Sequence, residues 1–110
     1  SIDQDQIEMV LINLIKNAVE ILEGQSQARI EIKSAVDQTA QRAVLEVIDN
    51  GPGIEPNALE QIFIPFFTTK EDGTGVGLSL SRQILQMHGG VLSVESQLGN
   101  GARFSLIFKA

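Results

Sequence analysis

Two pairs of short segments with alternating apolar side chains constrain the fold of this 110-residue chain more than any other feature. The first pair covers residues 29–36 and 42–49, and the second covers 91–96 and 102–108. Each pair is joined by a short polar or glycine-rich connector, whereas a parallel pair needs a crossover of about a dozen or more residues. The sequence therefore predicts two antiparallel hairpins.

Helical periodicity fills much of the remaining chain. Residues 3–23 and 77–88 carry apolar side chains at helical spacing, and a shorter helix is predicted over 55–62. Residues 63–76 show no clean period and are predicted as a mobile loop. The helices must cover one face of the strands. The expected fold is therefore an α/β two-layer sandwich with an antiparallel-rich mixed sheet and helices on one face.

Composition excludes several classes of function. A formal net charge of −6 argues against a partner that is a nucleic-acid backbone. The chain has no Cys and a single His, which rules out disulfides, thiolate catalysis and a His-clustered zinc site. No apolar run reaches the length of a membrane span and no signal peptide is visible. We therefore expect a cytoplasmic domain without membrane contact, in a parent protein that another segment could anchor.

Three glycine clusters punctuate the chain, at 49–53, 73–77 and 99–101. Taken singly, each is explained by a turn that needs positive φ. The segment Gly75-Val76-Gly77 also directly precedes a predicted helix, where free N–H groups and the positive helix end suit a polyphosphate. It is neither a Walker A loop, since no Gly-Lys-Ser/Thr follows, nor a Rossmann fingerprint, since no parallel strand precedes it.

Three polar side chains suggest nucleotide chemistry. Asn13 and Asn17 lie one helical turn apart on the same face of the first helix. An Asn oxygen is a suitable ligand for Mg²⁺, but the pair could equally make helix–loop contacts, and both interpretations stay open. Asp49 ends an apolar strand and could accept a hydrogen bond from the exocyclic amine of adenine. Guanine has a carbonyl there, so Asp49 would favour ATP over GTP.

Together these motifs resemble the catalytic, ATP-binding domain of sensor histidine kinases, in the GHKL superfamily shared with gyrase, MutL and a heat-shock chaperone ATPase. The resemblance covers nearly the whole chain and implies the Bergerat-type ATP-binding fold for a single domain, 1–110. The family normally has another strand before the first helix, so the domain is expected to be truncated at its N-terminus. The matching boxes, in the family's order, are 13–18, 49–54, 62–70, 73–78 and 99–104.

The resemblance implies a role for each matching residue. Asn17 would carry Mg²⁺, Asn13 would line the triphosphate, and Lys70 could reach the γ-phosphate as a third catalytic residue. Asp49 would take the adenine amine, and the glycines after it would shape the base pocket. The implied cofactor-binding set is Asp49, Gly51, Gly53, Ile54, Thr74, Gly75, Val76, Gly77 and Leu78.

Gyrase-like members carry a Glu that activates water at the position of Asn13. A carboxamide cannot take a proton from water, so this site suits transfer to a nucleophile delivered from elsewhere. The implied function is therefore binding of Mg²⁺ and ATP and transfer of the γ-phosphoryl group to a histidine. That histidine would lie on a separate dimerisation domain of the same parent protein, without which this domain would be inactive. A response regulator receiver domain would be a further partner.

Two other functions stay open, namely a nucleotide-binding regulatory module without transfer and a related protein-serine kinase. His88 precedes a Gly-Gly pair at a predicted helix end, where imidazole interacts favourably with the helix dipole. We therefore interpret His88 as structural and not as the phosphoacceptor. Phe63 and the tandem Phe66-Phe67 are interpreted as core or loop anchors. Ala102 stands where the family often has Thr, so a water-bridged contact to adenine would be lost.

Overall fold

The structure is a computed structural model that describes residues 4–59, 61–63 and 77–109. Both predicted hairpins and both predicted long helices are confirmed. The predicted loop lies outside the described residues beyond Phe63, as does residue 3 of the first helix. The elements, in chain order, are α1 (Gln4–Ile21), β1 (Ile30–Asp37), β2 (Arg42–Asp49), α2 (Pro56–Leu59), α3 (Gly77–Met87), β3 (Val91–Ser96) and β4 (Ala102–Lys109).

The short helix is the one element whose predicted extent is wrong. It was expected over 55–62, but α2 ends at Leu59 and residues 61–63 form turns. The amide of Gln61 donates to the carbonyl of Ala58, 2.8 Å away, which tightens the chain into an i to i+3 turn. One helical turn with no buried side chain has little packing to extend it.

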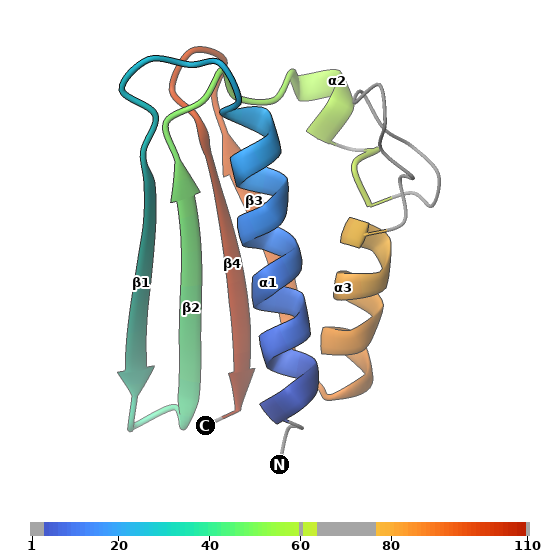
Figure 1. Ribbon diagram of the computed structural model, residues 1–110. Coiled ribbons are helices and arrows are strands. Elements are labelled where there is room, and N and C mark those ends of the chain that lie inside the picture. The colour runs from blue at the N-terminus through green and yellow to red at the C-terminus, as the bar shows by residue number, and fades with distance from the viewer. Residues whose placement is uncertain (1–3, 60, 64–76, 110) are drawn as a thin grey trace.

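The described strands form a four-stranded sheet in the order β1-β2-β4-β3, and every neighbouring pair is antiparallel (Figure 1). Strand β4 pairs with β2 over its whole length, from Asp49 opposite Ala102 to Arg42 opposite Lys109. The second hairpin therefore adds to the first through its last strand. This order brings the end of β2 and the β3–β4 turn to the same end of the sheet.

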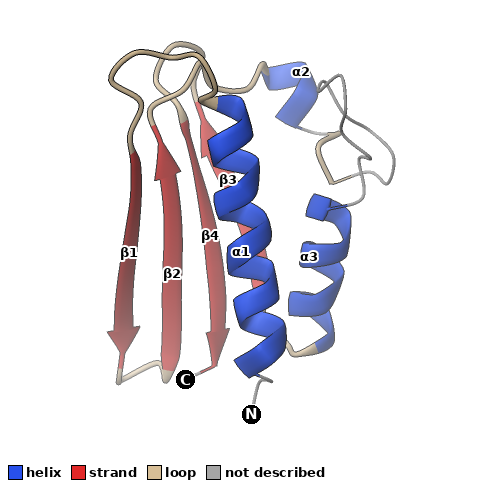
Figure 2. Cartoon of the chain, viewed as in Figure 1, coloured by secondary structure: helices blue, strands red, loops and turns tan. Residues whose placement is uncertain are grey.

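Helices α1 and α3 lie side by side on one face of the sheet, which confirms the two-layer α/β sandwich (Figure 2). Helix α1 buries one stripe of side chains at helical spacing, and that stripe faces the sheet. The largest fully buried side chains come from both layers and are Leu14, Leu85, Leu106, Val10, Val47 and Ser81. No helix in the described part of the chain is long and apolar enough to cross a membrane.

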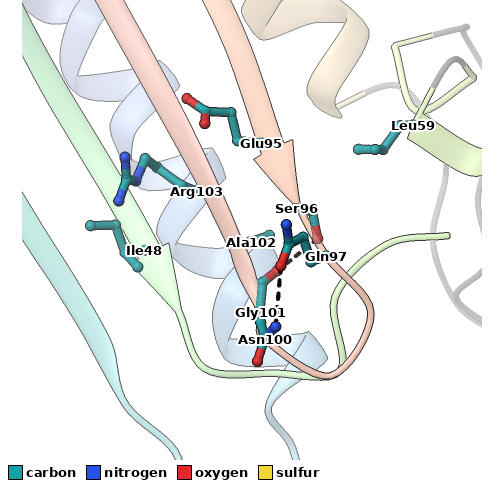
Figure 3. Close-up of a pocket in the computed structure, with 9 residues that line it drawn as sticks. All are labelled: Ile48, Leu59, Glu95, Ser96, Gln97, Asn100, Gly101, Ala102 and Arg103. Carbon is teal, nitrogen blue, oxygen red and sulfur yellow. Dashed lines mark hydrogen bonds between the residues drawn. The ribbon is translucent and has the colours of Figure 1, made fainter. Parts of the chain in front are cut away.

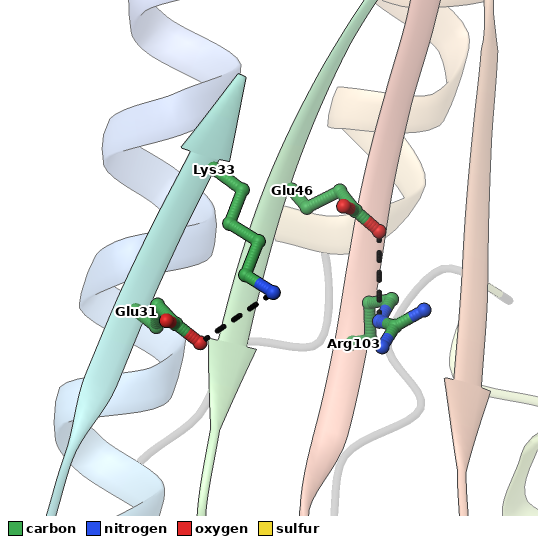
Figure 4. A network of polar contacts seen from close by, with 4 residues as sticks. All are labelled: Glu31, Lys33, Glu46 and Arg103. Atoms are coloured by element: carbon green, nitrogen blue, oxygen red, sulfur yellow. Dashed lines mark ion pairs between the residues drawn. The ribbon is translucent and has the colours of Figure 1, made fainter. Parts of the chain in front are cut away.

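The opposite face of the sheet carries charged side chains. Lys33 lies 4.0 Å from Glu31 along β1, and Arg103 on β4 lies 3.5 Å from Glu46 on β2 (Figure 4). Ion pairs as exposed as these contribute about 0–1 kcal/mol each. The stability of the fold therefore comes mainly from the core between the sheet and the two long helices.

Candidate functional site

Asp49 is a buried carboxylate at the end of β2. Strand alternation places it on the same face as Val47, toward the helices. Its side chain is 5% exposed, and the backbone N–H of Gly51 donates to its Oδ1 atom at 2.9 Å. Within the described residues, no fully buried side-chain polar atom lacks a partner. The hydrogen bond to this carboxylate within the described residues is therefore the one at Oδ1.

Gly51 sets how closely the chain after Asp49 approaches α1. A Cβ atom on Gly51 would lie 3.1 Å from Ile21 and 3.3 Å from Leu22, at the end of α1. The loop therefore packs against the C-terminal end of that helix, at the upper end of the molecule in Figure 1. The carboxylate sits where the sheet, α1 and this loop meet.

The loop after Asp49 is locked against the β3–β4 turn by two glycines with positive φ. A Cβ on Gly53 would lie 2.2 Å from the carbonyl oxygen of Gln97, and one on Gly101 would lie 2.0 Å from the carbonyl oxygen of Asp49. Such distances admit only hydrogen. Both glycines are therefore required by close backbone approach. The predicted role of Gly51 and Gly53 in shaping a base pocket stays a prediction.

A serine that sequence reasoning missed joins the same two loops. The N–H of Ile54 donates to Ser96 Oγ at 2.8 Å. Ser96 Oγ in turn donates to the carbonyl of Gly101 at 2.6 Å, and Figure 3 shows this second bond. Ser96 follows Leu92 and Val94 on the inward face of β3. A hydroxyl at an inward-facing strand position was the available signal, because buried polar groups need partners.

Asn13, the first of the paired carboxamides of α1, lies at the contact of this helix with α3. Asn13 and Asn17 are both half-buried. Asn13 Nδ2 donates to Ser81 Oγ at 3.3 Å, and Ser81 is fully buried on α3. Ser81 was also missed, although a serine on the apolar stripe of a helix was visible in the sequence. Asn13 thus faces the helix that follows the second glycine cluster.

Several predicted site residues fall outside the described part of the chain. They are Lys70, Thr74, Gly75 and Val76, together with Phe66 and Phe67. Of the second glycine cluster, Gly77 begins α3, and Leu78 is half-buried against the core. The structure therefore brings together Asp49, Gly51, Gly53 and Ile54, and separately places Asn13 against α3.

Two further residues have packing roles. Phe63 packs against the core, and the Arg82 guanidinium lies over its ring, 5.1 Å from the centroid. His88 Nε2 is in hydrogen-bond contact with Gln6 Oε1, which ties the end of α3 to the beginning of α1. These contacts agree with the structural interpretation of both residues.

A hollow of about 450 Å³ also adjoins the β3–β4 turn (Figure 3). Its lining combines Ile48, Glu95 and Arg103, on the face of the sheet away from the helices, with the inward-facing Ser96 and Ala102 and the turn between them. Neither Asp49 nor the carboxamides of α1 line it. The candidate site is therefore taken around Asp49, next to this hollow and not within it.

No group of three or more His, Cys, Asp or Glu side chains within the described residues could hold a metal ion. The side chains of the described residues therefore do not suit a metal ion that is held by protein ligands alone. They do suit Mg²⁺, which is commonly bound through one or two protein oxygens plus substrate phosphates and water. Asn17 offers one such oxygen, and Asn13 lies one turn away on the same helix.

Comparison with known proteins identifies the family. Residues 2–110 match the family described as histidine kinase-, DNA gyrase B- and HSP90-like ATPases. The sensor histidine kinase ZraS of Salmonella typhimurium is 41% identical over 94% of this chain and 22% of its own length. The sensor protein FixL of Bradyrhizobium diazoefficiens is 40% identical over 98% of this chain and 21% of its own. The chain thus spans about a fifth of these curated relatives.

Solved structures agree with the sequence comparisons. The catalytic domain of histidine kinase ThkA, in a nucleotide-free form, has a TM-score of 0.84 and 38% identity, covering 98% of this chain and 68% of that one. Full-length ShkA in complex with AMPPNP has a TM-score of 0.82 and 30% identity, covering 96% of this chain and 22% of that one. The chain belongs to this ATPase family, as an ATPase domain of the sensor histidine kinase type.

Proposed function

We propose that this chain binds ATP with Mg²⁺ and transfers the γ-phosphoryl group to a histidine on a separate dimerisation domain of its parent protein. The observation that carries the proposal is Asp49, a buried carboxylate whose Oδ1 is held by a backbone amide, and we assign Oδ2 to the ligand. The related kinase ShkA, 30% identical, has been solved with the ATP analogue AMPPNP. That likeness supports a nucleotide as the ligand.

Asp49 accounts for the choice of base. The N–H of Gly51 fixes Oδ1, so Oδ2 has a defined direction and can accept from the exocyclic amine of adenine. Guanine presents a carbonyl oxygen at that position, and two acceptors facing each other repel. Burial strengthens this discrimination, because an unmade hydrogen bond is not replaced by water.

The phosphates are proposed to lie between α1 and the N-terminal end of α3. Helix α3 begins at Gly77, so its first N–H groups have no partner within the helix and point toward its N-terminal side. Asn13 and Asn17 offer carboxamide oxygens from α1, which α3 contacts. Bound Mg²⁺ would neutralise phosphate charge, which matters in a chain with a net charge of −6.

Transfer to histidine suits the residues at this site better than hydrolysis. Asn13 carries no carboxylate to accept a proton from water. A neutral imidazole nitrogen needs no such base to attack the γ-phosphorus; the new N–P bond forms as the bond to the ADP oxygen breaks. The work left to the domain is positioning and charge neutralisation. We therefore propose a cytoplasmic domain that requires its histidine-bearing partner for activity, with a response regulator as the next acceptor.

Calorimetric titration with ATP and GTP, with and without Mg²⁺, tests the proposal directly. We expect wild type to bind ATP and to prefer it to GTP, whereas Asp49→Asn should weaken ATP binding by about 10–100-fold, since a hydrogen bond to a charged group contributes about 1.5–3 kcal/mol. Asp37→Asn is the matched control, because Asp37 is exposed and ends β1 at the opposite end of the sheet. Unchanged ATP affinity in Asp49→Asn would refute the assignment.

A second measurement addresses transfer itself. Asn17→Asp and wild type are incubated with labelled ATP and an added histidine-bearing dimerisation domain. Wild type should label the added domain, and Asn17→Asp should not, because a carboxylate beside the phosphates changes both charge and metal geometry. Asn57→Asp, an exposed change on α2, should behave as wild type. Tight ATP binding without any labelling would instead indicate a binding module.

A further inference from the structure

We propose that Ser96 is a positioning residue for the nucleotide site, whose hydroxyl sets the direction of the Asp49 carboxylate and thereby the preference for adenine. The inference rests on the proposed function, because it assumes that Asp49 reads the base. Ser96 lies on β3, two strands away from Asp49 on β2, and does not bond to that carboxylate. It would act through the two loops that it joins.

The Ser96 hydroxyl is both a hydrogen-bond acceptor and a hydrogen-bond donor toward those loops. It accepts from the N–H of Ile54 at 2.8 Å and donates to the carbonyl of Gly101 at 2.6 Å. Its removal would leave both backbone groups without this partner in a half-buried environment. A further bond, from the N–H of Gly99 to the carbonyl of Pro52 at 2.8 Å, joins the same loops farther out. Two sets of hydrogen bonds thus join these loops, and the bonds of Ser96 are the set nearer to the sheet.

Strand register connects Ser96 to Asp49. Ala102 on β4 pairs with Ser96 on one side and with Asp49 on the other, so the three residues form one row across the sheet. Gly101, which accepts the Ser96 bond, lies directly against the Asp49 carbonyl, since a Cβ added to it would be 2.0 Å from that oxygen. A shift of Gly101 must therefore move the backbone of Asp49.

The bond from Ile54 to Ser96 connects to the carboxylate by a second route, through the loop that follows β2. Ile54 lies near the end of the loop that follows Asp49, and within that loop Gly51 donates the bond that orients Oδ1. Gly53 lies against Gln97, so this loop cannot shift without moving the β3–β4 turn. The Ser96 hydroxyl therefore fixes the loop after Asp49 and the β3–β4 turn relative to each other, and the orientation of Oδ2 depends on both.

The test compares Ser96→Ala with Ser93→Ala. Ser93 lies on the same strand, where alternation places it on the face away from the helices, so the control removes an equal hydroxyl far from Asp49. Titration with ATP and GTP is done at a temperature at which circular dichroism shows each variant folded. We expect Ser96→Ala to weaken ATP binding about tenfold, which is the loss typical of one buried hydrogen bond. We also expect it to lower the ratio of ATP affinity to GTP affinity. Ser93→Ala should keep the wild-type ratio.

Ser96→Thr and Ser96→Val have side chains of nearly equal volume and differ in the hydroxyl, so their comparison measures the effect of the hydroxyl alone. This comparison can also be made if Ser96→Ala fails to fold. Ser96→Thr keeps the hydroxyl and should retain the wild-type ratio, whereas Ser96→Val should reproduce the loss. The amide resonance of Gly51 gives a second readout, because its shift reports the bond to Asp49 Oδ1. It should move in Ser96→Val and stay near its wild-type position in Ser96→Thr.

The outcomes separate this inference from the proposed function. Wild type that binds ATP, with a Ser96→Val or Ser96→Ala ratio equal to wild type, would show that the hydroxyl only stabilises the fold and would overturn the inference alone. An equal loss in Ser93→Ala would overturn it too. Wild type that binds no nucleotide would overturn the proposed function, and the inference with it.

Discussion

Replacing Gly101 with Ala tests how tightly the two loops beside Asp49 are packed. Gly101 has φ of 79°, and an added Cβ would lie 2.0 Å from the Asp49 carbonyl oxygen and 2.9 Å from its carbonyl carbon. Neither atom belongs to a flexible side chain. The backbone of β2 or of the β3–β4 turn must therefore move.

The expected cost has two parts. An L-residue in the left-handed region costs about 1–2 kcal/mol, and forcing extra volume into a packed site costs about 1–3 kcal/mol more. The sum of about 2–5 kcal/mol is a large share of the roughly 5–15 kcal/mol by which such domains are stable. For a domain near 100 residues this corresponds to a fall in Tm of about 10 °C or more.

Gly99→Ala is the matched control for the conformational part. Gly99 has φ of 83° in the same turn, but an added Cβ would meet nothing within 4 Å. It should lose about 1 kcal/mol, because the strain is partly offset by the smaller entropy of the unfolded chain. Urea unfolding followed by circular dichroism measures both. Equal losses in the two variants would refute the close approach of the loops.

Three further predictions concern the rest of the molecule. Leu106→Ala should cost about 2–5 kcal/mol in urea unfolding, because the side chain is 0% exposed on the central strand β4, whereas Leu98→Ala, at 59% exposure, should be near neutral. Asn50→Ala should cost about 1–3 kcal/mol, measured in the same way, because its carboxamide accepts from the N–H of Arg29 at 2.7 Å and donates to the carbonyl of Gln27 at 2.9 Å. Arg103→Ala should change Tm little in thermal melts at low and high salt, since the two side chains of its ion pair are partly exposed to water.

The local patterns of the sequence were enough to predict the layers of the fold. Alternating apolar residues predicted each strand, helical spacing predicted α1 and α3, and short connectors predicted the antiparallel hairpins. These signals are local, because a helix or a hairpin is formed by residues close together in the chain. The order of the boxes also made Asp49 and Asn13 candidate site residues, and their roles stay predictions.

Tertiary structure decided which side chains are covered and which support the site. Ile32 and Val36 alternate like core residues, yet they are 50% and 62% exposed, because β1 is the edge strand of the sheet. Ser96 bonds to Ile54 across 42 residues of chain, and Ser81 to Asn13 across 68. Pairings at such separations depend on strand order and helix packing, which no local pattern in the sequence records.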